Sequence, residues 1–388
     1  MEINGADNTD NLLIALPRLP WEIVCDIVSR FPIEAIVRFT SLSKACYSLK
    51  KDAAFIKLQL TRAKRRIIIE KRTANPMEEP LHGLYLLDEG EGGDSWKGRE
   101  IPIRSGDECY LGTAASCNGL LCVHSENTEA VPLFIYNPLT RESVTLPLSN
   151  PKAEFCIITT GFGFDSETGK YKVVKLFKID RKSGDSGGLP FRIEGEIITV
   201  GEKSWRRLGV PYIVLFGMRS SPVFSGGALH WIIDKTVHPS GLEKLLALDI
   251  STERFRSIDF SMTVRFPDNL HLVNYGDSLA LIERGDWDKL RVCKILGTKG
   301  CYKTHKSSYE IPVVRTPVIW NLSFRGFWSN DNFVFQCMPK NSSEETNKND
   351  HLALCCPKKK EFRIVEIFGV PNLFRAIFFV PTFVSLSA

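Results

Sequence analysis

Apolar residues near the N-terminus recur at the spacing of an amphipathic helix. They are Ile23, Val24, Ile27, Val28 and Phe31, with Glu22, Asp26 and Arg30 on the opposite side. We expect this helix to end at Phe31-Pro32, because the residue before a proline is pushed out of the α region, and Pro32 can open a second helix at its first position. The same spacing continues from Ile33 to Leu58, which predicts three or four short helices. Their apolar surface is too large to be buried among themselves, so the pattern implies a partner surface.

The pattern changes after Ile67 to short apolar runs broken by Gly, Asn-Pro and Ser-Gly, as expected for strands and turns. Asn118–Val123 and Ile135–Leu146 form one pair of such runs, and similar pairs recur at roughly 50 residues or twice that, a spacing typical of propeller blades. The recognisable units span residues 116–147, 161–209, 225–259, 275–310 and 330–367. A sixth unit could combine residues near 81–111 with the C-terminal strand Ala376–Val384 and close the ring. A β-sandwich is the alternative, but it explains the recurrence less well.

The helical segment resembles the F-box, the module that docks substrate receptors onto the Skp-type adaptor of SCF ubiquitin ligases. The matching pieces are Leu19-Pro20, Glu22-Ile23, Asp26-Ile27-Val28, Ser29-Arg30-Phe31-Pro32, Val37-Arg38-Phe39, Ser43-Lys44, Ser48-Leu49 and Asp52 to Phe55. The family usually has a cysteine just before the lysine and a tryptophan two residues after it, where this chain has Ser43 and Cys46. That change removes aromatic surface of the kind that anchors interfaces. The alternative is an ordinary helical cap on the following domain.

The F-box resemblance implies which side chains contact the adaptor. They are Leu19, Pro20, Ile23, Ile27, Phe31, Pro32, Ile36, Val37 and Lys44.

The remainder of the chain resembles the F-box-associated domains of large plant families, which are often grouped with kelch-like propellers. The matching strings are Ser116–Cys122, Tyr136–Thr140, Gly161–Asp165, Lys170–Val174 and Val370–Ala376. Together the two resemblances imply a disordered N-terminus over residues 1–15, a small all-α F-box over 16–64 and an all-β propeller of about six blades over 65–388.

Composition narrows the class of protein. The chain has 388 residues, of which 43% are hydrophobic and 24% charged, as in a soluble globular protein. No apolar run reaches the length of a membrane span. Its 11 cysteines have no regular framework and the N-terminus is polar, which favours reduced thiols in the cytoplasm or nucleus. A basic cluster runs from Arg62 to Arg72, but no aromatic residues interleave with it, so we expect a solvated helix end and no nucleic-acid surface.

Two serine motifs resemble those of hydrolases. Gly184–Gly188 places Ser186 in a nucleophile-like turn, but the matching histidine segment has Ser116 where the base should be. Ser278 follows Gly276-Asp277 at a repeat position that predicts a hairpin turn. No Cys-x-x-Cys pair, His-x-x-x-His pair or phosphate-binding loop is present, so we expect no metal and no cofactor.

The sequence therefore predicts a non-enzymatic substrate receptor. The helices would bind the Skp-type adaptor and through it a cullin, while the propeller would bind an unknown target protein, with no role for nucleic acid or a membrane. Loops such as Asp180–Pro190 and Lys340–Asp350 carry no legible code for the target. The alternatives are a kelch-like scaffold whose F-box has drifted out of adaptor binding and a serine hydrolase.

Overall fold

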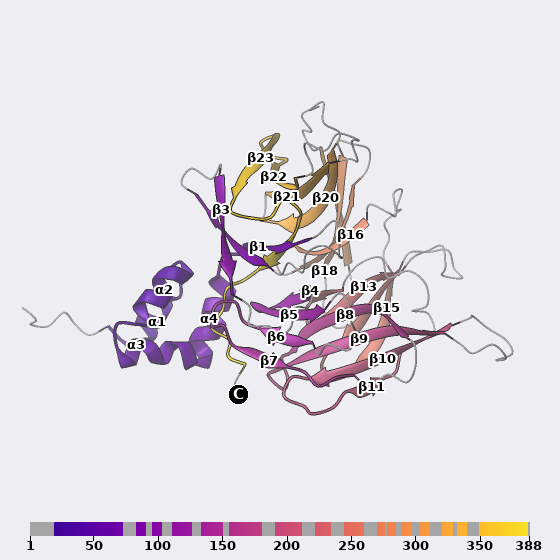
Figure 1. Ribbon diagram of the computed structural model, residues 1–388, viewed down its shortest axis with the longest axis horizontal. Coiled ribbons are helices and arrows are strands. Elements are labelled where there is room, and N and C mark those ends of the chain that lie inside the picture. The colour runs from indigo at the N-terminus through magenta and orange to yellow at the C-terminus, as the bar shows by residue number, and fades with distance from the viewer. Residues whose placement is uncertain are drawn as a thin grey trace, which may run out of the picture. The chain divides into compact units, whose positions relative to one another are not determined.

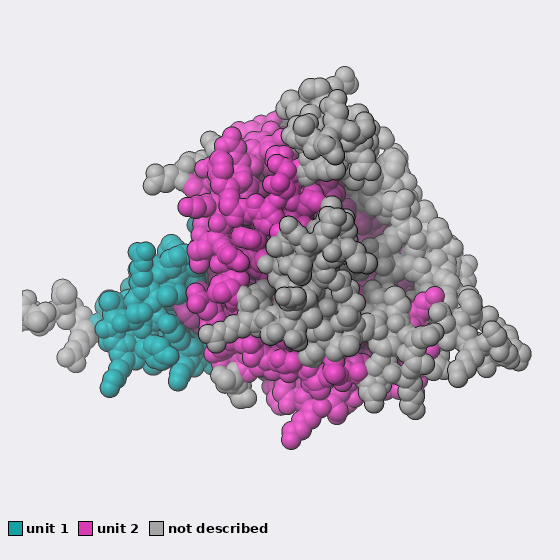
Figure 2. All heavy atoms as spheres, viewed as in Figure 1, with its two compact units in different colours: residues 1–64 teal, residues 65–388 magenta. Residues whose placement is uncertain are grey.

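The computed structural model describes most of the chain and divides it into two compact units, Met1–Lys64 and Arg65–Ala388 (Figure 2). The described residues are 19–72, 83–90, 95–102, 111–125, 133–149, 155–180, 191–211, 222–233, 244–259, 270–275, 278–284, 289–296, 303–310, 320–328, 332–339 and 349–386. The N-terminus predicted to be disordered, residues 1–15, lies outside them, and so do most residues of the loops Asp180–Pro190 and Lys340–Asp350.

The first unit is helical, as predicted (Figure 1). Its elements are α1 (Trp21–Val28), α2 (Ile33–Phe39), α3 (Lys44–Ser48), a 3₁₀ turn (Leu49–Lys51) and α4 (Ala53–Arg62). Pro20 and Pro32 stand at the N-caps of α1 and α2, one position before the first helical residue that we predicted for Pro32. The side chains of Ser43 and Asp52 cap the other two α-helices, because each accepts a backbone N–H three residues on, at 3.1 and 2.7 Å.

The second unit is a six-bladed propeller, which confirms the predicted fold class. Two consecutive blades are joined into one eight-stranded sheet, and the other four are separate four-stranded sheets. The first of these four blades contains β4 (Leu111–Cys117), β5 (Leu120–Ser125), β6 (Phe134–Tyr136) and β7 (Ser143–Thr145), and the second contains β8 (Phe155–Asp165), β9 (Lys170–Asp180), β10 (Phe191–Thr199) and β11 (Arg206–Leu208). The third contains β12 (Val223–Ser225), β13 (Ala228–Ile233), β14 (Lys244–Asp249) and β15 (Arg254–Asp259). The fourth contains β16 (Leu270–Tyr275), β17 (Ser278–Arg284), β18 (Lys289–Leu296) and β19 (Lys303–Glu310).

The eight-stranded sheet contains the fifth blade and the closing blade. Its strands are β20 (Trp320–Phe327), β21 (Phe333–Pro339), β22 (His351–Cys356), β23 (Glu361–Phe368), then β3 (Ser95–Ile101), β2 (Leu84–Glu89), β1 (Arg66–Lys71) and β24 (Phe374–Phe379). β23 and β3 pair in parallel, and all other neighbours are antiparallel. The innermost strands β4, β8, β12, β16, β20 and β24 each contact the next one around the ring, and β24 contacts β4 to complete it.

The blades are held together by apolar clusters, one between each pair of neighbours among the described residues. A middle strand therefore sends alternate side chains to opposite clusters. In β5, Leu120 and Cys122 pack toward the β8–β11 blade, whereas Leu121 and Val123 pack toward the closing blade. This burial on both faces explains why these strands read as continuous apolar runs.

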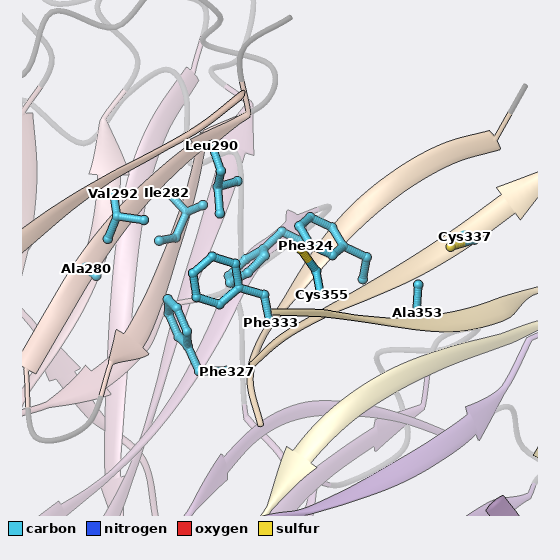
Figure 3. Close-up of a cluster of buried hydrophobic side chains, with 11 residues drawn as sticks. Ala280, Ile282, Leu290, Val292, Phe324, Phe327, Phe333, Cys337, Ala353 and Cys355 are labelled. Atoms are coloured by element: carbon cyan, nitrogen blue, oxygen red, sulfur yellow. The ribbon is translucent and has the colours of Figure 1, made fainter. Parts of the chain in front are cut away.

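One cluster, between the β16–β19 and β20–β23 blades, contains four buried phenylalanine rings (Figure 3). Phe327 and Phe333 lie edge to face with ring centroids 4.9 Å apart, and both are almost fully buried. Figure 3 shows them facing Ile282 of the neighbouring blade. Such contacts between rings add specific geometry to the burial of apolar area.

The ring closes through the C-terminal strand, as predicted. β24 pairs with β1 over six residues, from Arg66 opposite Phe379 to Lys71 opposite Phe374. Two details of the prediction were wrong. β1 belongs to the closing blade, and the C-terminal strand ends before Val380-Pro381, because proline has no N–H to donate to a ladder.

The tail after β24 is bound to the β4–β7 blade by Asn137, which is fully buried. Its Nδ2 donates to the carbonyls of Thr382 and Val384 at 3.1 and 2.7 Å, and its Oδ1 accepts the N–H of Leu139 at 2.9 Å. The tail also packs on Gly119, whose φ is 79° and whose missing Cβ would stand 2.1 Å from the carbonyl oxygen of Val380. No other residue type fits that turn.

We predict that Asn137→Ala destabilises the propeller by about 2–4 kcal/mol, because the carbonyls of Thr382 and Val384 and the N–H of Leu139 lose the hydrogen bonds that the buried amide makes. Urea denaturation followed by tryptophan fluorescence measures the loss. Asn372→Ala is the matched control, since the Asn372 side chain is exposed and should change stability little. Equal stability of the two variants would show that Asn137 does not hold the tail.

We also predict a loss of stability in acid that depends on His230 in β13. Burial lowers the pKa of this imidazole to about 4, its Nδ1 lies 3.3 Å from the carbonyl of Val223, and its buried Nε2 has no hydrogen-bond partner. The folded state thus prefers the neutral ring. The contribution of His230 to the free energy of unfolding is present in full above the ordinary histidine pKa of about 6.5. Below that pH the unfolded chain takes up a proton at His230 and the folded chain does not, so stability falls. The fall ends near pH 4, after a loss of about 3 kcal/mol. Denaturation curves between pH 7 and pH 4 measure this, and His230→Asn should lose that part of the pH dependence. A variant as acid-sensitive as the wild type would contradict the assignment.

Candidate functional site: an exposed apolar surface on the helical unit

The helical unit exposes large apolar side chains, which a folded domain normally buries. We call this set the docking surface, and its members are Leu19, Trp21, Ile23, Ile27, Phe31, Leu42 and Tyr47, between 40% and 74% exposed. The described part of the much larger second unit has three such residues, Leu148, Ile364 and Phe368. So many large apolar side chains left exposed on one small unit indicate a surface for another protein.

Helix α1 shows how the sequence produces this surface. Ile23 and Ile27, four residues apart, are 45% and 40% exposed, whereas Val28 on the other side is 2% exposed. One face of α1 therefore packs within the chain and the other presents apolar side chains outward. A helix that is apolar on two sides needs two surfaces to cover it.

The structure leaves most of the predicted adaptor contacts accessible. Leu19, Pro20, Ile23, Ile27, Phe31, Pro32 and Lys44 are exposed, and Val37 is half-buried. Ile36 is the correction, because its side chain is 1% exposed and contributes to the core together with Ile33. Helical periodicity shows that Ile36 is on an apolar face of α2, but it does not show whether that face packs inside the chain or contacts a partner.

Three members of the docking surface were missing from the predicted contacts. Trp21 opens α1, Leu42 follows α2 and is 74% exposed, and Tyr47 lies in α3 and is 52% exposed. The ammonium of Lys50 lies 5.3 Å from the centroid of the Tyr47 ring. The one sequence signal for them is their size, since a large apolar residue beside a helix end has few ways to be buried.

An ion-pair cluster joins the two ends of the helical unit. Arg62 at the end of α4 reaches Asp26 of α1, with Nη2 2.6 Å from Oδ1, and its Nη1 donates to the Ser29 hydroxyl at 2.6 Å. Arg30 pairs with the same carboxylate at 3.0 Å. The hydrogen bond from Arg62 keeps the pKa of Asp26 below its usual value. The Arg62 side chain thus holds α1 against α4. Arg62 is the first residue of the basic cluster noted in the sequence, and its role here is structural.

The two positions that depart from the F-box pattern lie together at the start of α3. Ser43 is exposed and its hydroxyl accepts the N–H of Cys46 at 3.1 Å, so serine is a suitable N-cap here. Cys46 is half-buried and free. The position that carries tryptophan in the family is therefore open enough for a partner to reach.

The described residues give little support for a serine nucleophile or a metal site. Ser278 begins β17 opposite Tyr275, and Ser186 lies outside the described residues. No group of three or more His, Cys, Asp or Glu side chains in the described residues could hold a metal ion. In the same part of the chain, no helix is both long and apolar enough to span a membrane.

Comparison with known proteins gives matches to both units. The F-box domain model matches residues 16–58, and the F-box associated beta propeller domain model matches residues 94–384. F-box protein At3g07870 of Arabidopsis thaliana is 27% identical and covers 93% of this chain and 90% of its own length. F-box protein CPR1 of the same plant is 29% identical over 64% of this chain and 60% of its own. A crystal structure of TolB from Acinetobacter baumannii covers 84% of this chain and 70% of its own at 14% identity and a TM-score of 0.46, and we draw nothing from it.

The two matches agree with the geometry. The propeller model covers more than half of the chain and spans the described strands from β3 to β24, and the F-box model covers the helices that carry the docking surface. The chain therefore belongs to the family of F-box proteins that carry an F-box associated β-propeller domain.

Proposed function

We propose that this protein is the substrate-recognition subunit of an SCF-type cullin-RING ubiquitin ligase. The docking surface would bind a Skp-type adaptor, and the adaptor would connect the chain to a cullin. The observation that carries the proposal is the set of large apolar side chains left exposed on helices that match the F-box domain.

The propeller would hold the target protein near the ubiquitin-charged enzyme. This function is not enzymatic, because raising the local concentration of a target lysine beside another protein's active site accelerates transfer without any catalytic group in the receptor. It requires no cofactor. A site of action in the cytoplasm or nucleus fits a chain with buried, unpaired cysteines.

A second candidate is a non-degradative scaffold whose F-box no longer binds the adaptor. Cys46 favours it, since the position lacks the aromatic side chain usual in the family. Adaptor affinity separates the two candidates.

We predict that Ile23→Asp weakens adaptor binding by at least about tenfold, because a carboxylate would be buried without a partner in the interface. The fold should survive, since Ile23 lies in the first turn of α1, where a negative charge is favoured. Co-purification and titration calorimetry with a Skp-type adaptor measure the effect. Ile364→Asp is the matched control, because Ile364 is a similarly exposed isoleucine on the propeller, at 40% against 45% for Ile23. If both variants bind like the wild type, the docking surface is not the adaptor site.

We predict that Cys46→Trp tightens adaptor binding several-fold, because an aromatic ring at this accessible position adds apolar contact area. Calorimetry with the same adaptor gives the dissociation constants, and Cys46→Ala serves as a control that should bind like the wild type. A wild-type chain that binds no adaptor, together with a Cys46→Trp chain that does, would favour the scaffold. Equal affinities for all three chains would place Cys46 outside the interface.

A further inference from the structure

Three arginines from three different strands approach each other where the closing blade meets the β20–β23 blade. Arg72 follows β1, Arg325 lies in β20 and Arg375 lies in β24. The backbone N–H of Arg72 donates to the carbonyl of Leu373 at 3.0 Å, which places the end of β1 beside the start of β24. β20 and β24 are neighbouring innermost strands of the ring. Cations gathered from separate strands need either compensating charge or an anionic ligand.

Arg325 is the least satisfied member of the three. The register of β20 against β21 shifts between Phe324 and Gly326, so Arg325 is the extra residue of a β-bulge. Its Nε is buried and has no hydrogen-bond partner. Burial and the neighbouring Arg375 and Arg72 lower the pKa of its guanidinium to about 10. A buried donor without an acceptor is costly, and it calls for an explanation such as a missing ligand.

The nearby carboxylates compensate for only part of this charge. Asp350 Oδ2 already accepts hydrogen bonds from Gln336 Nε2 and from the N–H of Phe374, each at 2.9 Å. The Glu70 carboxylate lies 3.8 Å from the Arg375 guanidinium, an ion pair at a distance beyond a hydrogen bond. At Arg325 the electrostatic effect of Asp350 is smaller than that of either neighbouring arginine, so this carboxylate offsets only part of the positive charge there.

We propose that Arg72, Arg325 and Arg375 form a binding site for a carboxylate side chain on an acidic segment of the target protein. The inference rests on the proposed function, in which the propeller binds the target. Arg72 is exposed, the Arg375 side chain is 34% exposed and Arg325 is half-buried, so an incoming chain can reach the cluster from the side of Arg72 and Arg375. A planar guanidinium matches a carboxylate in shape and charge, and the Arg325 Nε–H is a donor without a partner among the described residues.

Fluorescence anisotropy with a labelled short polyglutamate peptide, on the full chain at fixed ionic strength, tests this inference. We expect Arg325→Gln to weaken peptide binding by at least about tenfold. Arg207→Gln should bind like the wild type, because Arg207 is 78% exposed on β11 and pairs with Glu194 at 3.1 Å. Arg72→Gln repeats the test at an exposed position if the first variant fails to fold, and thermal unfolding of each variant checks the fold.

Each outcome either supports or overturns the proposed carboxylate-binding site. Peptide binding of equal strength in Arg325→Gln, or in Arg72→Gln where the first variant does not fold, overturns the site. So does a wild type that binds inorganic phosphate but no polyglutamate. Adaptor binding by the same variants is measured in parallel. Loss of peptide binding with intact adaptor binding in Arg325→Gln supports the site, whereas a wild type that binds the peptide but no adaptor refutes the receptor function and leaves the site standing.

Discussion

The pairing of β1 with β24 is the interaction on which the second unit depends. These strands stand at opposite ends of the propeller sequence, and their six residue pairs supply the innermost strand of the closing blade. Two of the six clusters between blades contain residues of β1 and β24, so opening this pair would expose both clusters at once. The entropy cost of bringing the ends together grows only with the logarithm of the loop length, while the apolar area gained does not shrink with distance along the chain. A ring of blades is therefore stable only when complete, and Asn137 reinforces the closure from the neighbouring blade.

Much of this fold could be predicted because the middle strands of each blade bury both faces and read as apolar runs. The innermost strands were less visible. The predicted units began at residues 275 and 330, whereas β16 and β20 begin at Leu270 and Trp320. In β20, Asn321, Ser323 and Arg325 interrupt the apolar residues, and the Thr113–Ser116 part of β4 is small or polar, which weakens the apolar pattern of both strands. β1 pairs with β2 nearby in the sequence and with β24 some 300 residues away, and local patterns carry no information on the distant partner that makes β1 part of the closing blade.

The docking surface was predictable in kind but not in every residue. Helical spacing identified Ile23 and Ile27 correctly as apolar positions, but it could not say which apolar residues the chain covers itself. Ile36 is buried and Leu42 is exposed, although both are apolar residues near the same helix. The deciding factor is tertiary packing. Burying the exposed half of one such side chain contributes only about 1 kcal/mol, so binding an adaptor tightly needs several of them acting together, with aromatic anchors among them.

The motif strings of the propeller are explained by its internal packing. Asp165 and Lys172, from the Gly161–Asp165 and Lys170–Val174 strings, form a buried ion pair at 3.2 Å. The ammonium of Lys172 also bonds the carbonyl of Ile250 at 2.9 Å, and the Ser251 hydroxyl donates to Asp165 at 2.6 Å, so the pair connects one blade to the next.

Burial opposes ionisation of Asp165, but the donors around it hold the pKa of this carboxyl well below its usual range. A charge pair enclosed in this way is costly to break from either side, because the remaining partner would stay buried and uncompensated. Side chains committed to bonds between blades are not available to a target. If the propeller binds a target as proposed, contacts with that target have to come from side chains that these bonds between blades do not occupy.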